Sequence, residues 1–203
     1  MAQDNQEQEA KFFLSRPLAL EERLKQNGAR LMHARVFESN LRFDLPDGSL
    51  TRRRHVLRLR QDERIRLTFK GAMAAEQEVS DRTEIEVEVS SFEHTRALLE
   101  ALGYRVSVMY EKYRTTYELG GCEVTLDEMP YADFAEIEGP GAPAIQAVAK
   151  LLGLDWSARS LDSYLVFFDR LRQAGRLHAR NLSFAEVTQK FPAEVFGLRP
   201  ADG

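Results

Sequence analysis

Charged and apolar residues alternate at every second position in several segments of this chain. The longest such run is RTEIEVEV at residues 82–89. A period of two is typical of an extended strand, with the charges on one face of a sheet and the apolar side chains on the other. Shorter runs of the same kind occupy residues 7–11, 57–60, 64–70, 112–114 and 135–138. We count about eight strands, a common number for a small closed barrel.

Helical patterns separate these strands. Pro17 suits a first helical turn, and the apolar residues that follow it lead to a stop at Gly28. Further helices are expected over 92–103, after a capping-box pattern of Ser90 and Glu93, and over about 144–153 and 160–175. Ser183 opens a short last helix, and the residues from about 191 onward are expected to be loosely ordered.

A weak internal repeat relates two parts of the chain. Each part reads as a charged strand, a short helix, a Gly-x-Arg step at Gly28 or Gly103, and a longer strand. Two such halves can close one antiparallel sheet into a barrel. Turn signals at 46–48 and 120–121 place hairpins between neighbouring strands.

The helices decide which face of the sheet points inward. Helices with an apolar stripe need an apolar sheet face to cover, such as the side that carries Ile85, Val87 and Val89. The charged face then lines the lumen. We therefore expect an α+β fold, a closed eight-stranded antiparallel β-barrel with a charged lumen and with helices packed outside. The competing interpretation, commoner for any single strand, is a half-exposed sheet with its charges in solvent.

Composition limits the class of protein. The 203 residues are 43% hydrophobic and 30% charged, which is typical of a globular domain with a real core. No apolar run approaches 18 residues, so no membrane span is expected. The first residues lack a signal-peptide pattern and Cys122 is the single cysteine, so we expect a reducing cytoplasm. The net charge of -4 argues against general nucleic-acid binding.

A charged lumen needs a charged ligand. Charges held together in a partly dry space are costly unless they are paired or liganded. Arginine and lysine favour polyphosphate, whereas clustered carboxylates favour hard divalent cations such as Mg²⁺ or Mn²⁺. A metal-bound triphosphate satisfies both groups, so a triphosphate-containing small molecule is the expected partner.

Nine short motifs resemble those of the CYTH domain, the family also called triphosphate tunnel metalloenzymes, and they follow one another along the chain in the family's order. They are Glu7-x-Glu9-x-Lys11, Arg42-Phe43-Asp44, Leu57-Arg58-Leu59-Arg60, Thr68-Phe69-Lys70-Gly71, Arg82-Thr83-Glu84-Ile85-Glu86, Lys112-Tyr113-Arg114, Leu126-Asp127-Glu128, Ala135-Glu136-Ile137-Glu138-Gly139 and Ser163-Tyr164. The similarity covers about residues 5–172. We expect a tunnel domain at 1–172 and a C-terminal helical extension at 173–203.

The resemblance implies roles for particular residues. The expected metal ligands are Glu7, Glu9, Glu84, Glu86, Asp127, Glu136 and Glu138. The expected substrate-binding residues are Lys11, Arg58, Arg60, Lys70, Arg82, Lys112 and Arg114, and those expected to be catalytic are Lys11, Lys112 and Glu138.

Three functions fit this pattern. The first is a metal-dependent hydrolase of inorganic, nucleoside or thiamine triphosphate. The second is a class IV adenylate cyclase, which makes cyclic AMP and pyrophosphate from ATP. The third is a non-catalytic polyphosphate- or nucleotide-binding module. We favour the hydrolase, because water is always available whereas a cyclase needs one ribose geometry. The sequence leaves the oligomeric state open, a homodimer included.

Overall fold

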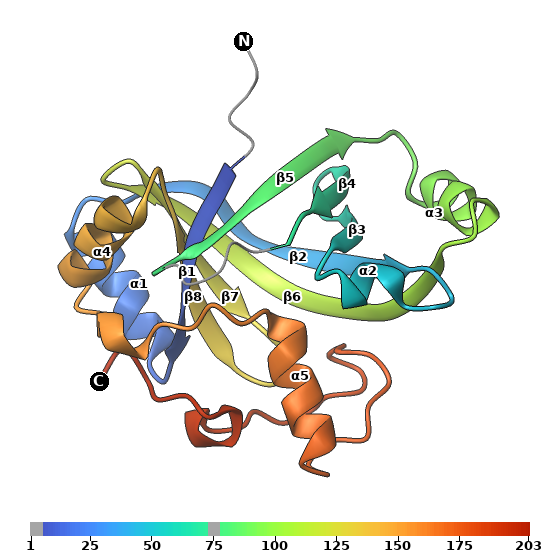
Figure 1. The fold of residues 1–203 in the computed structure, drawn as a ribbon. Helices are drawn as coiled ribbons and strands as arrows, with labels where there is room; N and C mark the ends of the chain where they lie inside the picture. Colours follow the sequence, from blue (N-terminus) through green and yellow to red (C-terminus); the bar gives the residue numbers. More distant parts are fainter. Residues whose placement is uncertain (1–5, 73–77) are drawn as a thin grey trace.

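The alternating segments form eight antiparallel strands within residues 6–72 and 78–203, the part of the chain that the computed structural model describes (Figure 1). The strands are β1 (Gln6–Leu14), β2 (Arg30–Asp44), β3 (Val56–Gln61), β4 (Ile65–Lys70), β5 (Ser80–Glu88), β6 (Arg105–Leu119), β7 (Cys122–Glu128) and β8 (Asp133–Glu138). They follow one another around a closed barrel in the order β1-β5-β4-β3-β2-β6-β7-β8. The expected fold class is confirmed.

Strand β1 closes the barrel, because it pairs with β5 on one side and with β8 on the other. Glu9 is the residue where the two ladders overlap, opposite Ser80 in β5 and Glu138 in β8. The expected hairpin at Gly120 and Gly121 joins β6 to β7 in two residues, both with positive φ, 60° and 76°. Two consecutive positive φ values match the twist of a tight hairpin, and glycine adopts them without strain.

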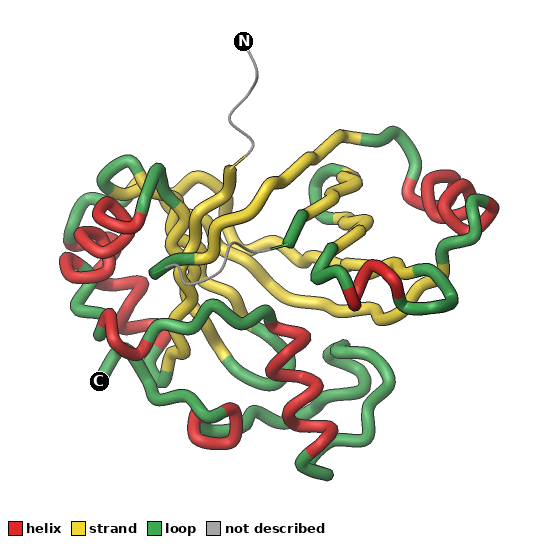
Figure 2. Tube along the Cα trace, in the orientation of Figure 1, coloured by secondary structure: helices red, strands yellow, loops and turns green. Residues whose placement is uncertain are grey.

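Helices surround the barrel on the outside (Figure 2). They are α1 (Pro17–Gln26), α2 (Ser49–Arg52), α3 (Phe92–Ala101), α4 (Ala142–Leu151) and α5 (Tyr164–Gln173), with 3₁₀ helices η1 (Trp156–Ala158) and η2 (Ala193–Phe196). None of the helices in the described residues combines the length and apolar character that a bilayer crossing requires.

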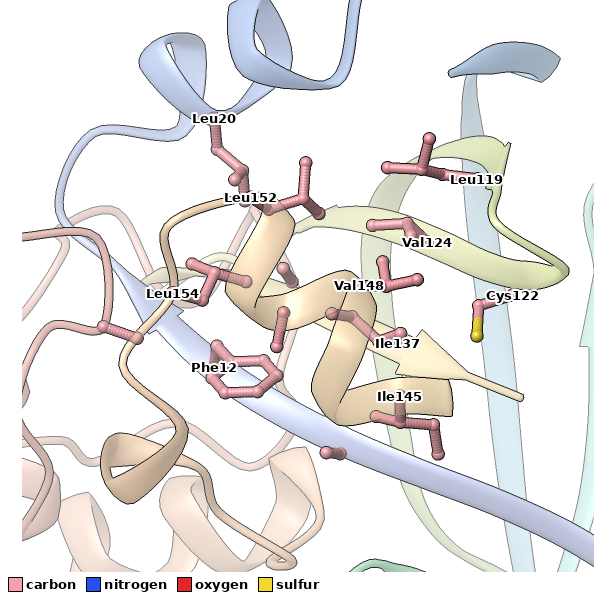
Figure 3. Packing of buried hydrophobic residues seen from close by; sticks show 14 of the residues in the cluster. Phe12, Leu20, Leu119, Cys122, Val124, Ile137, Ile145, Val148, Leu152 and Leu154 are labelled. Atoms are coloured by element: carbon pink, nitrogen blue, oxygen red, sulfur yellow. The ribbon is translucent and has the colours of Figure 1, made fainter. Parts of the chain in front are cut away.

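Three apolar clusters attach these helices to the barrel wall. In the first, α1 and α4 pack on the outer faces of β1, β7 and β8, through residues such as Leu20, Ile145 and Ile137 (Figure 3). In the second, Leu99 of α3 packs against Leu59 of β3. In the third, α5 and the C-terminal segment cover one region of the barrel with aromatic side chains. This outer packing leaves the charged faces of the strands to line the lumen.

Two helix starts differ from the expectation. Ser91, not Ser90, caps α3, and its hydroxyl accepts a hydrogen bond from the backbone N–H of His94. Helix α5 begins at Tyr164, not near Ser160, because Ser160 is held in an extended bridge to Lys11 of β1 by backbone hydrogen bonds in both directions. The tertiary pairing with β1 overrides the local helical pattern.

The connection after Pro46 also differs from a simple hairpin. The buried carboxylate of Asp44 accepts hydrogen bonds from the backbone N–H groups of Leu45, Leu50 and Thr51. These bonds stabilise the short helix α2 between β2 and β3.

The outer face of β5 is not covered by helices as we expected. Ile85 is 50% exposed and Val87 is 49% exposed, whereas Val89 packs in the cluster beneath α3. Helix α3 packs mainly against β3 instead, and the outer face of β5 stays half-exposed.

The C-terminal segment is packed, contrary to the expectation of loose order from residue 191. Phe196 and Ala201 are buried, and the backbone N–H groups of Phe191 and Ala201 donate to the carbonyls of Tyr131 and Phe13. The expected helix at Ser183 is a single hydrogen-bonded turn, so the helical structure after residue 173 is limited, in the described chain, to η2. The division at residue 172 into a domain and an extension stays a prediction.

Asp202 fastens the end of the chain to the start of α1. Its fully buried carboxylate accepts hydrogen bonds from the Ser15 backbone N–H (2.9 Å), the Ser15 hydroxyl (2.9 Å) and the Arg16 backbone N–H (2.6 Å). Burial opposes ionisation, but these hydrogen bonds outweigh it and lower the pKa of Asp202.

We predict that Asp202→Ala lowers the free energy of unfolding by about 1–3 kcal/mol at pH 7, because it removes the charged acceptor of the Ser15 and Arg16 backbone N–H groups. A carboxylate with a lowered pKa in the folded state stabilises above its unfolded pKa and loses that effect as pH falls. The difference between wild type and variant should therefore shrink below about pH 4. Urea unfolding at pH 7 and pH 3.5 measures both effects. Asp169→Ala, on the exposed face of α5, is the control and should change stability by less than about 0.5 kcal/mol.

Candidate active site in the barrel lumen

The barrel encloses a cavity of about 370 Å³ that is lined mainly by charged side chains. All of the expected substrate-binding cations face it, namely Lys11, Arg58, Arg60, Lys70, Arg82, Lys112 and Arg114. Five of the expected carboxylates face it as well: Glu9, Glu84, Glu86, Glu136 and Glu138. The structure therefore brings together expected residues from six of the eight strands, because side chains at every second position of a strand face the same side of the sheet.

The cations lie mainly on one wall of the lumen. In the barrel, Arg58 of β3 stands between Arg42 of β2 and Thr68 of β4, and Arg60 stands beside Arg66 of β4. Lys112 and Arg114 of β6 continue this wall. Guanidinium groups in adjacent positions suit several oxygens of one phosphate chain, because each is a planar fork of donors.

Carboxylates form a row on the other side. Glu9 of β1 pairs in register with Glu138 of β8, which pairs in register with Glu123 of β7. All three line the cavity, and Glu138 and Glu123 are exposed, so this row lies where solvent reaches the lumen. Like charges at neighbouring cross-strand positions repel each other unless a cation lies among them.

One ion-pair network connects the two walls. The Lys11 ammonium lies 2.6 Å from a Glu136 oxygen and 3.8 Å from Glu9, and Arg114 contacts the other Glu136 oxygen. Burial would raise the pKa of Glu136, but Lys11 and Arg114 outweigh it and hold that pKa well below its usual range. Burial likewise opposes the charge on Lys11, and the surrounding carboxylates more than compensate, so its pKa is raised. Both groups are therefore ionised at neutral pH.

Asp127 of β7 lies on the same strand face as the cavity-lining Glu123 and Thr125, but it is buried beneath its partners and is 1% exposed. It accepts hydrogen bonds from Lys112 (3.0 Å), from Arg114 through Nε (2.6 Å) and a terminal nitrogen (2.5 Å), and from the Tyr164 hydroxyl (2.6 Å). Four donors match the lone-pair capacity of a carboxylate. These contacts orient the two cations toward the cavity, and the expected role of Asp127 as a metal ligand stays a prediction.

The carboxylates of β5 have similar contacts. Glu84 lies 2.7 Å from the Lys70 ammonium, and Glu86 accepts a hydrogen bond of 2.8 Å from the Thr68 hydroxyl while lying 3.8 Å from Arg58. Arg82, at the start of β5, lies 3.6 Å from Glu9. The strand β5 thus contributes counter-charges to the cationic wall.

Glu38 is a buried lumen residue that our sequence analysis did not identify. Its carboxylate lies 3.5 Å from Arg60, 3.6 Å from Lys112 and 4.0 Å from Arg114. Burial would raise its pKa, but these cations outweigh it and lower the pKa strongly. The signal was present, because Glu38, Asn40 and Arg42 follow the same period-two pattern in β2.

Tyr164 lines the lumen although it belongs to a helix outside the barrel. It opens α5, its ring lies 4.6 Å from the Lys11 ammonium, and its hydroxyl holds Asp127. The Tyr131 hydroxyl donates to the Tyr164 carbonyl and fixes the start of the helix. No strand periodicity could indicate this residue, because a helix that docks on the barrel delivers it.

The donor chemistry fits a hard divalent cation. The row of Glu9, Glu138 and Glu123 supplies only oxygen, which Mg²⁺ and Mn²⁺ prefer. In the conformation of residues 6–72 and 78–203, however, no three carboxylate, imidazole or thiolate side chains lie close enough together to hold an ion. Binding of such an ion would therefore require some carboxylates to turn away from their lysine or arginine partners. The side chain of Glu7, another expected ligand, lies outside the described residues.

Comparison with solved structures places the fold among known ones. A Vibrio parahaemolyticus protein named as a candidate adenylate cyclase aligns with a TM-score of 0.72 and 23% identity, over 80% of this chain and 97% of that chain. A Hippeastrum protein, named as a candidate adenylyl cyclase and described as having a dominant triphosphatase activity, aligns with a TM-score of 0.59 and 18% identity, over 86% of this chain and 98% of that chain. A chain of the Schizosaccharomyces pombe Mediator head module aligns with a TM-score of 0.54 and 14% identity, over 72% of this chain and 94% of that chain.

These likenesses concern the fold, because each identity is below 25%. No curated protein sequence matches the chain. The family model of the CYTH domain matches residues 5–152, which includes all eight strands and most of the lumen residues described above. The chain therefore belongs to the CYTH domain family.

Proposed function

We propose that this protein is a divalent-metal-dependent hydrolase that releases phosphate from triphosphate compounds. The observation that supports this most directly is the lumen itself, in which a wall of arginine and lysine faces a row of carboxylates across one cavity of about 370 Å³. A binder of anions alone would be weakened by the carboxylates. The triphosphatase activity described for the Hippeastrum protein agrees with this proposal.

The cations would hold the phosphate chain. Arg58 and Arg60 offer planar forks of donors, whereas Lys11 and Lys112 offer compact charges. The raised pKa of Lys11 keeps it protonated, and the ion pair with Asp127 orients Lys112. Phosphoryl transfer depends mainly on positioning and charge neutralisation, so it needs no covalent nucleophile. We assign Lys11 and Lys112 to contact with the reacting phosphate.

The carboxylates divide into two groups in this proposal. Glu9, Glu136 and Glu138 would hold the metal, with Glu7 assigned on the family resemblance. When bound, Mg²⁺ or Mn²⁺ would neutralise charge on the phosphate oxygens and make a bound water more acidic. The exposed Glu138 would orient the attacking water. Asp127, Glu84 and Glu86 would orient Lys112, Lys70 and Arg58 through the contacts described above.

The lumen offers little to a nucleobase. Among the described residues that line the cavity, the aromatic rings are those of Tyr110 and Tyr164. The Tyr164 hydroxyl is bonded to Asp127, and the Tyr110 hydroxyl lies 3.5 Å from Arg58. Both rings belong to the apolar cluster beneath α5. This arrangement favours contact with phosphates over stacking on a base, so we rank hydrolysis above cyclisation.

The first prediction concerns products. With Mg²⁺ or Mn²⁺, the purified protein should release orthophosphate from inorganic triphosphate or a nucleoside triphosphate. EDTA should abolish turnover, because without the metal the carboxylates would repel the phosphate chain. Orthophosphate, pyrophosphate and cyclic AMP are measured separately. Cyclic AMP as the main product from ATP would establish the cyclase instead. Tight triphosphate binding without any product would establish the non-catalytic module.

The second prediction concerns side chains. Glu138→Gln and Lys11→Ala should stay folded and lower kcat by about 100-fold or more. The first would remove a carboxylate assigned to the metal and the attacking water, and the second a charge assigned to the reacting phosphate. Glu100→Gln and Lys25→Ala remove matched charges from the exposed faces of α3 and α1, and should keep wild-type turnover. Circular dichroism checks the fold, and Lys11→Met retains the buried volume if alanine unfolds the protein. Near-normal kcat in both folded site variants would refute the assignment.

A further inference from the structure

Arg42 is a lumen residue that the proposed function has not used. It lies on β2, lines the cavity and stands directly beside Arg58 of β3 in the register of the two strands. Along β2, Arg42 lies four residues beyond Glu38, and Glu38 is directly opposite Lys112 in the pairing of β2 with β6. Four residues of strand span about 13 Å, so Arg42 extends the cationic wall well past the Lys112 level.

The guanidinium of Arg42 has no acceptor among the residues that the structure describes. Within residues 6–72 and 78–203 it makes no hydrogen bond and no ion pair, whereas Arg58, Arg60 and Arg114 each have at least one carboxylate within 4.0 Å. Asp44, two residues away, is not available, because its oxygens accept the hydrogen bonds that stabilise α2. An arginine in a lumen without a partner is costly.

The surroundings of Arg42 make this cost larger. Burial lowers its pKa, and so do the charges of Arg58 and Arg82, while Tyr110 and Asp44 offset only part of the effect. A base whose pKa is lowered in the folded state destabilises the fold while it is charged. Groups held in such unfavourable settings gather at functional sites, where a ligand supplies the missing interaction.

We propose that Arg42, together with Arg58, binds an anionic group at the far end of the substrate, so that this protein selects an extended phosphate chain whose end near Arg42 carries charge. The inference rests on the proposed function for its substrate class, but not for the binding step. A guanidinium pairs best with a negatively charged hydrogen-bond acceptor, and two phosphate oxygens can accept two parallel hydrogen bonds from Arg42. A neutral organic group at this position would leave the arginine unpaired.

Metal-free binding of inorganic triphosphate to Arg42→Gln tests the proposal directly. We expect the affinity to fall by roughly 10- to 100-fold, the range for loss of charge-assisted hydrogen bonds. Arg42→Lys should retain part of the affinity, because it keeps the charge and loses the fork. Arg53→Gln removes an exposed arginine near α2 and should bind like wild type. Unchanged affinity of Arg42→Gln would overturn the proposal.

Two further measurements separate binding from a structural role. Without anions, Arg42→Gln should unfold at the wild-type temperature or above it, because it removes an uncompensated charge. A melting temperature several degrees lower would assign Arg42 to the fold instead. Inorganic pyrophosphate should lose less affinity than triphosphate, because a shorter chain that contacts Lys112 does not extend to Arg42. Equal losses for both ligands would overturn selection by chain length.

Turnover distinguishes this inference from the proposed function. If the protein hydrolyses triphosphate, Arg42→Gln should raise KM by a factor similar to its loss of affinity and change kcat by less than about threefold. If the wild type has no turnover, the proposed function fails while the metal-free binding comparison still decides the role of Arg42. A large fall in kcat with unchanged KM would contradict the assignment of Arg42 to binding.

Discussion

The enclosure of many opposite charges inside one β-barrel is the constraint on which this structure depends. Removing ionised groups from water is costly, and the cost is met only when each group has a counter-charge, a hydrogen bond or a ligand. Glu136 and Lys11 satisfy each other, and Asp127 satisfies Lys112 and Arg114 with the help of Tyr164. The lumen is therefore a network in which moving one side chain changes the partners of several others. A ligand that brings both a divalent cation and phosphate oxygens could replace these internal pairs on both walls.

The rest of the chain holds this network in place. Strand β1 closes the barrel and carries Glu9 and Lys11 into the lumen, so the same strand supplies both closure and charge. The C-terminal segment packs on α5, which presents Tyr164 to Asp127, and Asp202 ties the chain end to the start of α1. Parts of the molecule that lie outside the matched family region thus support the orientation of residues within it.

The cationic wall is not uniformly satisfied. Arg60, Arg114 and Arg58 have acidic neighbours, whereas Arg42 has other arginines beside it and an aspartate whose oxygens stabilise α2. Unmet positive charge of this kind reduces the stability of the empty protein and increases the free energy gained on binding an anion. In the row of Glu9, Glu138 and Glu123, Lys11 and Arg82 already lie near Glu9, and a bound divalent cation would further reduce the repulsion among the carboxylates.

The sequence by itself determined the strands, the inward direction of their charges and most of the lumen residues, because side-chain alternation in a strand is a local property with a fixed period. Lys11, Arg58, Lys112 and Glu136 could be named for this reason. The same period also contained Glu38 and Arg42, which we did not assign. Only the tertiary structure decided which charges meet. It shows that three residues donate to Asp127, that Glu123 lies beside Glu138 and Glu9, and that a docked helix delivers Tyr164. It also shows that Arg42 has no acceptor within residues 6–72 and 78–203. Those facts depend on strand register and on contacts between residues far apart in the chain, and no local pattern encodes them. Two predictions were wrong for the same reason: that helices cover β5, and that the chain is loosely ordered from residue 191. Packing between elements far apart in the sequence determines both features.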